Sequence, residues 1–401
     1  MKIKSLKQFK MMLTPPPDKS ITIRAAILGA IADGKTTVIN PLMCGDTVST
    51  FNCVSNFADL SMDGGNIIVR RKKFCDCVMD AGNSATTARL LMGVASGRNN
   101  VVKFVGDRSL CSRNMCSTVQ PLIKMGAQIE GERCPLTVKG GNLNGIDFVP
   151  SSPSAQVKSA VLLAGINAEG VTTVTETVQT RTHTEDMLKN FGANIVAVNS
   201  VVKVSRSELK GQDVYVRGDI SSAAYPLVLG LLKGFCRTTN VCNKRRAIID
   251  FFTRIGGDVT EIKKGEVSDI ITQKSELKPF QISGGEATAL IDELPLLACL
   301  AATIEGRSVI KDAAALRNKE CDRIAVTAKN LSAIGVSVTE TKDGLIIDGK
   351  SDVNYSGAIQ TKGDHRIAMS FAVLLAAKGG GYIDDDKCVG ISYPSFWELF
   401  L

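Results

Sequence analysis

The chain has 401 residues, 44% of them hydrophobic and 22% charged, a composition typical of globular proteins and not of disordered ones. One ordinary hydrophobic core does not extend over such a length, so we expect two domains. The net charge of +8 suits small anionic ligands as well as nucleic acid. The densest basic patch, Arg70 to Lys73, is short, and we interpret it as a solvated strand end.

Cysteine and histidine usage gives no indication of a metal site. The 12 Cys are scattered without a CxxC pair, and His183 and His365 lie far apart, whereas zinc sites need closely spaced ligands. The opening MKIKSLKQFK lacks an apolar signal region, and no apolar stretch reaches membrane-spanning length. Many unpaired thiols indicate a reducing compartment. We therefore predict a cytoplasmic protein that binds neither metal nor membrane.

Taken in chain order, the predicted elements form an internal repeat. Six times, an apolar helix of small residues is followed by a Gly and then by a short β-prone run. The copies read AAILGAIADG-KTTVI, LLMGVASG-RNNVVKF, AVLLAGINAEG-VTTVTE, YPLVLGLLKG-FCRTTNV, LLACLAATIEG-RSVI and FAVLLAAKG-GGYI. Their closing glycines are Gly34, Gly97, Gly170, Gly234, Gly306 and Gly379.

A second element lies between these copies and consists of an amphipathic helix, a Gly and another strand. Its segments are MCSTVQPLIKMGAQIE, HTEDMLKNFGANIVAV, RAIIDFFTRIGGDVTEI and DRIAVTAKNLSAIGVSVTE. The Gly after the last apolar turn is the expected left-handed cap of each helix. Each repeat thus approximates β-α-β-α-β-β. We predict an α/β fold of two similar lobes, each built from three such repeats with buried helices and surrounding sheets.

The segment from Gly29 to Thr36 matches the phosphate-loop pattern GxxxxGK[ST]. Such a loop works only between a strand and a following helix, where backbone N–H groups face the phosphate. Here a helical stretch comes first and a strand-like TTVI follows. We therefore interpret Gly34 as a helix cap and not as part of an ATPase site.

Polar residues gather at the starts of the apolar helices, first in PPPDKSITIR. Lys19 and Ser20 stand at a helix start, and Arg24 lies one turn further along the same face. Ser20 alone would be an ordinary N-cap. Two cations beside it, at the positive end of a helix, favour an anion site.

The segments DAGNSATTAR and PSSPSAQVKSAVLLAG repeat this arrangement. The first places Thr86 and Arg89 near a helix start, where a plain capping segment explains the sequence equally well. The second places Ser154 and Gln156 just before a buried helix. Arg113, in GDRSLCSRNM, would be an ordinary surface residue without these neighbours.

The last third of the chain holds the candidate acid and base. IDELPLLA, LRNKECDRIA and GDHRIAMSFAVLL each place charged residues at the start of an apolar helix. One such cluster is usually a solvated helix face, whereas three of them favour a functional site. The charged residues are Asp292, Glu293, Arg317, Lys319, Glu320, Asp322, Arg323, Asp364, His365 and Arg366.

Together these stretches resemble a known family. DKSxxxR, GNSATTAR, SAQVKSAVLLAG, RTHTEDML, GDISSAAYPLV, DELPLLA, LRNKECDR and DHRIAM are similar, in this order, to the signatures of 5-enolpyruvylshikimate-3-phosphate (EPSP) synthases. The resemblance runs from about Pro16 to Phe396. It implies an enolpyruvyl transferase fold of two lobes with three units each, which agrees with the repeat count. It also implies transfer of the enolpyruvyl group of phosphoenolpyruvate to the 5-hydroxyl of shikimate 3-phosphate, in aromatic amino acid biosynthesis.

The resemblance assigns residues to each substrate and requires no metal or organic cofactor. For shikimate 3-phosphate it implies Lys19, Ser20, Arg24, Ser154, Ala155, Gln156, Thr180, Asp292 and Lys319, with Arg181 near the phosphate. For phosphoenolpyruvate it implies Lys19, Ala85, Thr86, Arg113, Gln156, Arg323, His365 and Arg366. Asp292 would accept the 5-hydroxyl proton, Glu320 would move a proton to and from the methylene carbon, and Lys19 would touch both substrates.

Ala85 departs from the pattern, because many family members have Gly at this position. The extra methyl would narrow the phosphoenolpyruvate pocket, as in family members that tolerate the inhibitor glyphosate. One methyl at such a contact changes the free-energy difference between the binding of two competing ligands by roughly 1–3 kcal/mol. The sequence therefore predicts weakened inhibition by glyphosate.

Three other functions are alternatives to this one. The sister transferase that acts on UDP-N-acetylglucosamine has Lys-Asn where this chain has Lys19-Ser20, although Cys111 and Cys116 lie near the position of its loop Cys. A nucleic-acid-binding protein is a second alternative, since the fold also occurs in an RNA-end cyclase, but the chain has no basic stripe and few aromatic residues. A catalytically inactive scaffold conflicts with the retained Asp292 and Glu320.

The chain is expected to cross twice between the lobes, near Pro15 to Pro17 and near Arg217 to Ser221. The lower lobe would then be residues 15–217, and the upper lobe residues 1–14 plus 218–401, with the active site in the cleft between them. The first strand would belong to the upper lobe. We expect a monomer whose partners are its two small-molecule substrates.

Overall fold

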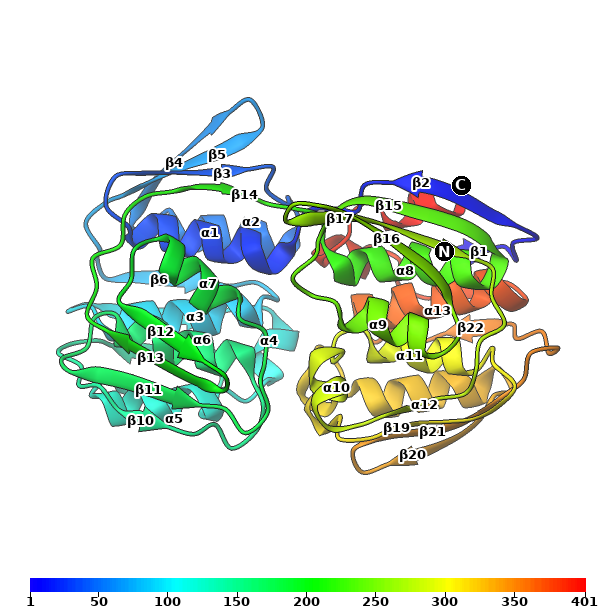
Figure 1. Cartoon of the computed structure of the whole chain (residues 1–401). Helices are drawn as coiled ribbons and strands as arrows, with labels where there is room; N and C mark the ends of the chain where they lie inside the picture. Colours follow the sequence, from blue (N-terminus) through cyan, green and yellow to red (C-terminus); the bar gives the residue numbers. More distant parts are fainter. The chain divides into compact units, whose positions relative to one another are not determined.

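The computed structural model describes residues 1–401, and the chain divides into two compact units (Figure 1). The N-terminal unit is Pro17–Val216, and the C-terminal unit combines Met1–Pro16 with Arg217–Leu401. The chain therefore begins in the C-terminal unit, leaves it once and returns once. No helix of the structure combines the length and the apolar character needed to span a bilayer.

The N-terminal unit contains three four-stranded sheets with the strand orders β14-β3-β5-β4, β6-β7-β9-β8 and β10-β11-β13-β12. Each sheet joins one parallel pair to an antiparallel hairpin, as in β6 parallel to β7 and β8 paired with β9. The elements are α1 (Lys19–Ile31), β3 (Lys35–Ile39), α2 (Gly45–Val54), β4 (Ala58–Asp63), β5 (Asn66–Arg71), β6 (Cys77–Asp80), α3 (Ala85–Ser96), β7 (Val101–Val105), α4 (Arg108–Ser112), α5 (Cys116–Met125), β8 (Gln128–Glu130), β9 (Leu136–Lys139), β10 (Asp147–Phe148), α6 (Ala155–Gly165), β11 (Val171–Thr175), α7 (His183–Asn190), β12 (Ile195–Val198), β13 (Val201–Ser205) and β14 (Asp213–Tyr215).

The C-terminal unit repeats this plan in the sheets β16-β17-β15-β2 and β18-β19-β21-β20, whereas its third sheet has only the strands β1-β23-β22. The elements are β1 (Lys2–Ile3), β2 (Phe9–Leu13), α8 (Ile220–Lys233), β15 (Gly234–Cys242), α9 (Ala247–Arg254), β16 (Asp258–Lys264), β17 (Val267–Gln273), β18 (Gln281–Ile282), α10 (Gly284–Ala289), α11 (Leu294–Ala301), β19 (Gly306–Ile310), η1 (Ala314–Asn318), α12 (Arg323–Ala333), β20 (Ser337–Thr341), β21 (Gly344–Gly349), β22 (Gly357–Ile359), α13 (His365–Lys378), β23 (Gly381–Ile383), η2 (Lys387–Ile391) and η3 (Phe396–Phe400).

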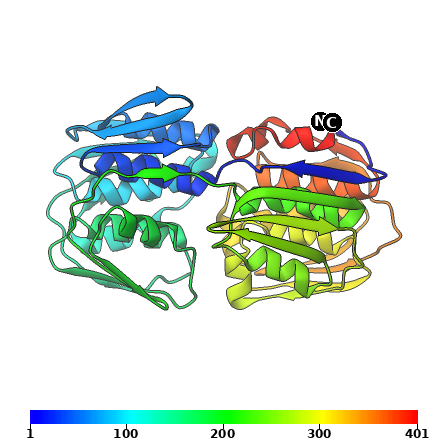
Figure 2. The same cartoon turned by 45° about the horizontal axis from the view of Figure 1, so that its top comes forward.

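Each complete repeat reads β-α-β-α-β-β, for example β18-α11-β19-α12-β20-β21, so the predicted α/β repeat fold is confirmed. The sixth repeat is shorter than predicted. After α13 and β23 the chain forms the 3₁₀ turns η2 and η3 in place of a second helix and hairpin. The N-terminal strand β1 pairs antiparallel with β23 and takes the place of that hairpin, and Figure 2 shows this first segment, in blue, beside the red end of the chain.

The two predicted kinds of helix are both present. The small-residue helices are almost entirely buried, as in α13, where every residue from His365 to Ala377 is buried. The glycines that follow α5, α7, α9 and α12 adopt positive φ angles, as predicted. They are Gly126 (115°), Gly192 (85°), Gly256 (92°) and Gly335 (91°).

The phosphate-loop pattern lies between helix α1 and strand β3, in the order that excludes a phosphate loop. The cap of α1 is Ala32, so the prediction of Gly34 as the cap is wrong by two positions. Gly34 has a φ of 87° and turns the chain into β3. A glycine is needed at this position for the left-handed turn and not for binding a nucleotide.

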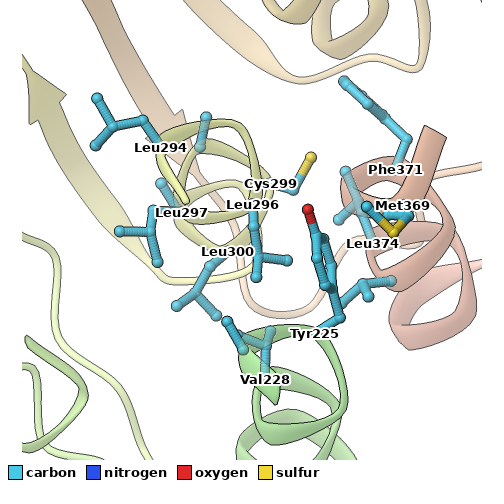
Figure 3. Close-up of a cluster of buried hydrophobic side chains, with 14 of the residues drawn as sticks. Tyr225, Val228, Leu294, Leu296, Leu297, Cys299, Leu300, Met369, Phe371 and Leu374 are labelled. Carbon is cyan, nitrogen blue, oxygen red and sulfur yellow. The ribbon is translucent and has the colours of Figure 1, made fainter. Parts of the chain in front are cut away.

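The core of each unit is a set of helices packed on one another between the sheets. In the N-terminal unit, α3 and α6 approach so closely that a Cβ on Gly93 would lie 2.2 Å from the carbonyl oxygen of Ala160. In the C-terminal unit, side chains of α8, α11 and α13 interdigitate, including Val228, Leu297 and Leu374 (Figure 3). The buried helices are therefore fixed in place, and so are the residues at their first turns.

Candidate active site

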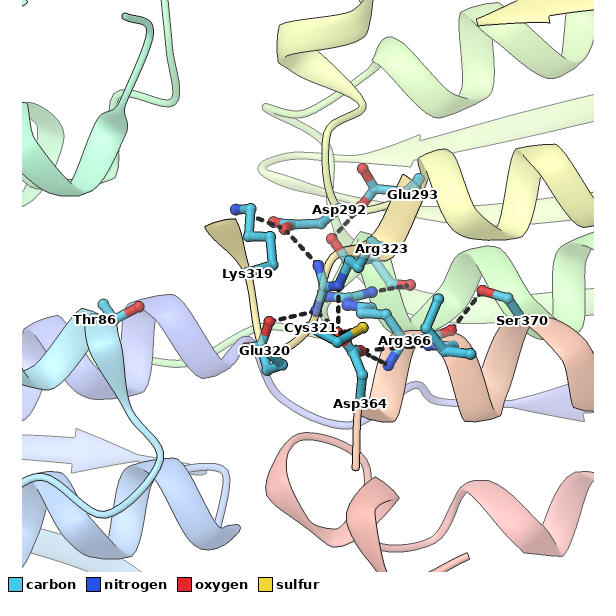
Figure 4. A network of polar contacts seen from close by, with 12 residues as sticks. Thr86, Asp292, Glu293, Lys319, Glu320, Cys321, Arg323, Asp364, Arg366 and Ser370 are labelled. Carbon is cyan, nitrogen blue, oxygen red and sulfur yellow. Dashed lines mark hydrogen bonds and ion pairs between the residues drawn. The ribbon is translucent and has the colours of Figure 1, made fainter. Parts of the chain in front are cut away.

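Three helices of the C-terminal unit begin within one charged cluster (Figure 4). Asp322 precedes α12, and its carboxylate accepts a hydrogen bond from the Ala325 N–H at 3.0 Å. Asp364 precedes α13 and accepts from the Arg366 N–H at 2.8 Å. Aspartate is a favoured N-cap because it satisfies N–H groups that have no partner inside the helix. These caps hold charged residues at the first turns of the amphipathic α12 and the buried α13.

Arg323 lies at the centre of this cluster and is only 2% exposed. Its guanidinium donates to both carboxylate oxygens of Asp364, at 2.8 and 3.2 Å, and to Glu320 at 2.7 Å. Burial alone would lower the pKa of Arg323, but Asp364 and Glu320 raise it above its ordinary value. Arg323 is therefore a permanent cation held by a bidentate contact.

Asp292 and Glu320 are partly exposed carboxylates that contact the buried Arg323. Asp292 lies 3.7 Å from the Lys319 ammonium and 3.8 Å from the Arg323 guanidinium. Its side chain is 21% exposed and that of Glu320 is 14% exposed. Both carboxylates can therefore exchange protons with a ligand while remaining oriented by cations.

Arg366, in the first turn of α13, is buried against Tyr225. One guanidinium nitrogen lies 3.3 Å from the Tyr225 hydroxyl oxygen and 3.5 Å from the carbonyl oxygen of Ser221. Burial alone would lower the pKa of Arg366, whereas Tyr225 and Asp292 raise it well above the ordinary value. His365, which precedes Arg366 and begins α13, is 2% exposed. A second fixed cation thus stands beside the carboxylates.

The N-terminal unit presents its own set of polar residues, first at the start of α1. The N-cap is Asp18, whose carboxylate accepts from the Ile21 N–H at 3.0 Å, so Ser20 is not the cap. The Lys19 ammonium donates to Asp46 at 2.8 Å. Asp46 was not predicted as a site residue, because nothing local connects it with Lys19.

Arg24 is buried one turn further along α1. Its guanidinium donates to the Thr184 hydroxyl at 2.7 Å, to the Ser20 carbonyl at 3.0 Å and to the Ser159 hydroxyl at 3.1 Å. Burial, together with the positive charge of Arg181, lowers the pKa of Arg24 to about 10, although Asp18 and Glu185 partly oppose this shift. The contacts join α1 to the second turn of α6 and to the first turn of α7. Arg24 is therefore held as a cation on three sides.

The starts of α3 and α6 are connected by side chains. Ser84 caps α3, so the capping interpretation of this segment is confirmed for Ser84, and the buried Ala85 begins the helix. Gln156 donates to the Thr86 hydroxyl at 2.7 Å, and its own amide oxygen accepts from Arg89. The amide of Gln156 is therefore oriented by one donor and one acceptor.

Ser154 is the N-cap of α6. Its hydroxyl oxygen accepts from the Val157 N–H at 3.3 Å, which leaves its O–H able to donate to a ligand. Ala155 follows as the first residue of the helix and Gln156 as the second. Ser154 thus lies just before the helix, as predicted, whereas Gln156 lies inside its first turn.

Two further predicted residues are held in loops of this unit. Arg113 follows α4 and donates to Asn83 at 2.8 Å and to Ser109 at 3.0 Å. Thr180 lies between β11 and α7, where both its N–H, at 3.2 Å, and its hydroxyl donate to Glu176. Each loop residue is therefore oriented by a specific partner.

The predicted site residues divide between the two units, and contacts connect some of them within each unit, such as Gln156 with Thr86 and Asp292 with Arg323. The N-terminal unit holds Lys19, Ser20, Arg24, Ala85, Thr86, Arg113, Ser154, Ala155, Gln156 and Thr180. The C-terminal unit holds Asp292, Lys319, Glu320, Arg323, His365 and Arg366.

Comparison with known proteins identifies the family. A model of the family EPSP synthase (3-phosphoshikimate 1-carboxyvinyltransferase) matches residues 3–400. The chain belongs to this family. A 3-phosphoshikimate 1-carboxyvinyltransferase from Aquifex aeolicus is 42% identical, over 100% of this chain and 98% of its own length. One from Geobacter metallireducens is 40% identical, over 99% of this chain and 97% of its own length.

Solved structures agree with this assignment to the EPSP synthase family. The 2.37 Å structure of EPSP synthase from Acinetobacter baumannii has a TM-score of 0.84 and 35% identity, covering 99% of this chain and 96% of that one. The enolpyruvyl transferase NikO from Streptomyces tendae has a TM-score of 0.79 at 16% identity, covering 100% of this chain and 96% of its own. The second likeness concerns the fold alone. The predicted family and fold are therefore confirmed.

Besides Asp46, three residues beside the predicted site of this EPSP synthase family member were missed as parts of it. Asp364 was noted as a charged residue at a helix start, but not as the partner of Arg323. Cys321 donates to Asp364 at 3.5 Å, and burial together with Asp364 raises the pKa of its thiol above the usual range. Glu176 orients Thr180. Only Asp364 carried a signal, since an Asp directly before an apolar helix predicts an N-cap.

Proposed function

We propose that the chain transfers the enolpyruvyl group of phosphoenolpyruvate to the 5-hydroxyl of shikimate 3-phosphate and releases phosphate. The observation that carries this proposal is the cluster of Asp292, Glu320 and Arg323, which combines two partly exposed carboxylates with a buried cation. Family membership over almost the full chain supports the same activity. The reaction belongs to the shikimate pathway of aromatic amino acid biosynthesis.

The reaction is an addition followed by an elimination. A proton adds to C3 of phosphoenolpyruvate, C2 becomes electrophilic, and the 5-hydroxyl oxygen bonds to C2 as its own proton leaves. The C2–O bond to phosphate then breaks, and loss of a proton from C3 restores the double bond. The products are the enolpyruvyl ether and inorganic phosphate. Each step needs a proton donor or acceptor and a cation beside the phosphate.

In this proposal, the carboxylates of the C-terminal unit move the protons. Asp292 accepts the proton of the 5-hydroxyl, and Glu320 supplies and removes the proton at C3. General acid and base groups of this kind each contribute about 10²–10⁴-fold. Arg323 and Arg366 bind phosphoenolpyruvate with His365 beside them, and Lys319 contacts a ring hydroxyl.

The N-terminal unit supplies most of the groups that bind anions. Arg24, Ser20 and the triplet from Ser154 to Gln156 bind shikimate 3-phosphate, with Thr180 near its phosphate. Arg113, Thr86 and Ala85 bind phosphoenolpyruvate, and Lys19 touches both substrates. Guanidinium groups suit this role because they donate two parallel hydrogen bonds to a carboxylate or phosphate.

We also propose that these two units act as lobes around one active site, with limits near Pro15 to Pro17 and Arg217 to Ser221. Both substrates then need residues from both units, and closing of the lobes would exclude water from the reaction. Small-angle scattering with and without the two substrates tests this point. A decrease in the radius of gyration that requires shikimate 3-phosphate supports closure, and an unchanged radius contradicts it.

The first experiment measures phosphate release from phosphoenolpyruvate, with and without shikimate 3-phosphate, for the wild type and Asp292→Asn. We expect release to require shikimate 3-phosphate and to fall at least about a hundredfold in the variant. Release that depended on UDP-N-acetylglucosamine instead would assign the chain to the sister activity, which the comparisons do not favour. Absence of release with either acceptor would contradict both activities.

We further propose that the enzyme is a monomer of the cytoplasm. All 12 cysteines are free in the structure, which fits a reducing compartment. Light scattering after size exclusion tests the first point, since a mass near 42.7 kDa is expected. Fractionation of the native host tests the second.

A further inference from the structure

A buried ammonium joins two carboxylates in the N-terminal unit, outside the residues assigned to the reaction. Lys158, in the second turn of α6, is 0% exposed. Its Nζ lies 2.7 Å from Glu176 Oε2 and 2.6 Å from Glu185 Oε1. Both carboxylates are buried as well. Three buried charges are costly to remove from water, so hydrophobic packing does not explain their presence.

The two carboxylates flank one loop. Glu176 directly follows β11, Glu185 lies in the first turn of α7, and residues 177–182 form the loop between them. Lys158 therefore binds both ends of the loop at a single point. Within it, Thr180 donates its N–H at 3.2 Å and its hydroxyl to Glu176 Oε1. Glu176 thus binds the buried ammonium with one carboxylate oxygen and the loop with the other.

The neighbours of this cluster extend it to Arg24. The Ser159 and Thr184 hydroxyls are 2.6 Å apart, and each accepts from the Arg24 guanidinium. Ser159 is next to Lys158 in the sequence, and Thr184 is next to Glu185. The second turn of α6 and the first turn of α7 are therefore joined to each other by ion pairs and to α1 by hydrogen bonds.

We propose that Lys158 is a positioning residue for the anion of shikimate 3-phosphate, acting through Glu176 on the loop that carries Thr180 and Arg181. The inference rests on the proposed function, because it concerns how the chain binds that substrate. Lys158 itself touches no substrate, since its ammonium is fully buried between two carboxylates. It fixes the loop before substrate arrives, which reduces the entropy lost on binding.

The test replaces Lys158 with methionine, which has a similar length and no charge. We expect the KM for shikimate 3-phosphate to rise about ten- to hundredfold, as is typical when a hydrogen-bonded charge loses its partner. The KM for phosphoenolpyruvate should change by less than about threefold. Lys189→Met is the matched control, since Lys189 is an exposed lysine of α7. It should leave both constants unchanged.

A double-mutant cycle separates positioning from a general loss of structure. If Lys158 acts through the loop, Lys158→Met and Thr180→Val should raise the KM for shikimate 3-phosphate in a non-additive way. Additive effects, or equal changes in both KM values, would overturn the proposal. Glu176→Gln provides a second route if Lys158→Met does not fold, and it should again affect shikimate 3-phosphate alone.

Calorimetric titration with shikimate 3-phosphate alone distinguishes this inference from the proposed function. Weaker binding by Lys158→Met than by the wild type supports the inference. Equal binding by both proteins overturns it while leaving the activity intact. A wild type that neither binds shikimate 3-phosphate nor releases phosphate in its presence contradicts the proposed function itself.

Discussion

The two units use the same repeat but place their carboxylates differently. In the N-terminal unit, Glu176 and Glu185 lie buried behind the polar residues and are paired with Lys158. In the C-terminal unit, Asp292 and Glu320 are partly exposed, while Arg323 and its partner Asp364 are buried. A buried carboxylate orients its neighbours, whereas a surface carboxylate can exchange a proton with a ligand. In the proposed function, this contrast would place most of the anion-binding groups in one unit and the proton-transfer groups in the other.

The contrast follows from what caps the helices. The helices α3 and α6 of the N-terminal unit begin with the neutral caps Ser84 and Ser154, which leaves the helix dipole free to attract an anion. The helices α12 and α13 of the C-terminal unit begin with Asp322 and Asp364. These caps bring negative charge to the helix start, where it holds arginines. At these four helices the cap residue therefore sets the charge of the helix start, whereas α1 of the N-terminal unit, which is capped by Asp18, does not follow this contrast.

The largest effect is expected for Glu320→Gln in the C-terminal unit. The substitution keeps the shape of the side chain and removes the proton donor, so phosphate release should fall by about 10²–10⁴-fold. KM values should change much less. Glu340→Gln serves as the control, since Glu340 pairs with Arg317 at the surface. A loss below about tenfold would contradict the role of Glu320 in proton transfer.

A smaller effect is expected for Arg24→Lys in the N-terminal unit. The guanidinium donates to three acceptors, and an ammonium cannot reproduce this planar arrangement. The KM for shikimate 3-phosphate should rise by about tenfold or more, with a smaller change in kcat. Arg254→Lys, on the exposed side of α9, is the control. A fall in kcat with an unchanged KM would place Arg24 in the chemistry instead and break the division between the units.

Ala85→Gly tests the inhibitor prediction at the start of α3. Removal of one methyl should strengthen inhibition by glyphosate, by about tenfold for a difference near 1.4 kcal/mol. The KM for phosphoenolpyruvate should fall or stay constant. Gly near a helix start costs at most about 1 kcal/mol, which a thermal melt measures separately. Unchanged inhibition would show that Ala85 does not limit the pocket.

Local patterns in the sequence predicted the elements well. The four glycine caps, from Gly126 to Gly335, and the buried helices each depend on residues a few positions apart, so periodicity and cap chemistry suffice. The shortened sixth repeat was missed because the strand that completes its sheet, β1, lies at the opposite end of the chain. Pairing between distant strands leaves little local signal in a single sequence.

The partners of the site residues depend on contacts between distant segments. Lys19 pairs with Asp46, Arg24 with Thr184, and Arg323 with Asp364, in each case from a different element. Residue types and helix starts indicated where charges would gather, and the family resemblance assigned their roles. Neither indicates which carboxylate would orient a given cation, because that depends on how the helices pack.

The smallest predicted effect concerns pH and the buried Glu185. Burial raises the pKa of Glu185, although Lys158 beside it lowers it. Between the ordinary pKa and this raised value, the folded protein binds more protons than the unfolded chain, so this group adds stability as the pH falls. Glu185→Gln removes that titration. The free energy of unfolding of the wild type should therefore rise relative to the variant on acidification, by at most about 1.4 kcal/mol per pH unit.

Urea denaturation followed by circular dichroism between about pH 7 and pH 4.5 measures this difference, with the exposed Glu130→Gln as the control. A constant difference between wild type and Glu185→Gln would mean that Glu185 titrates alike in the folded and unfolded chain. That result would contradict the N-terminal half of the comparison, because burial would then have no net effect on the pKa of Glu185. If the difference in unfolding free energy between the two proteins grows as the pH falls, Glu185 is a buried carboxylate, in contrast to the partly exposed Asp292 and Glu320 of the C-terminal unit.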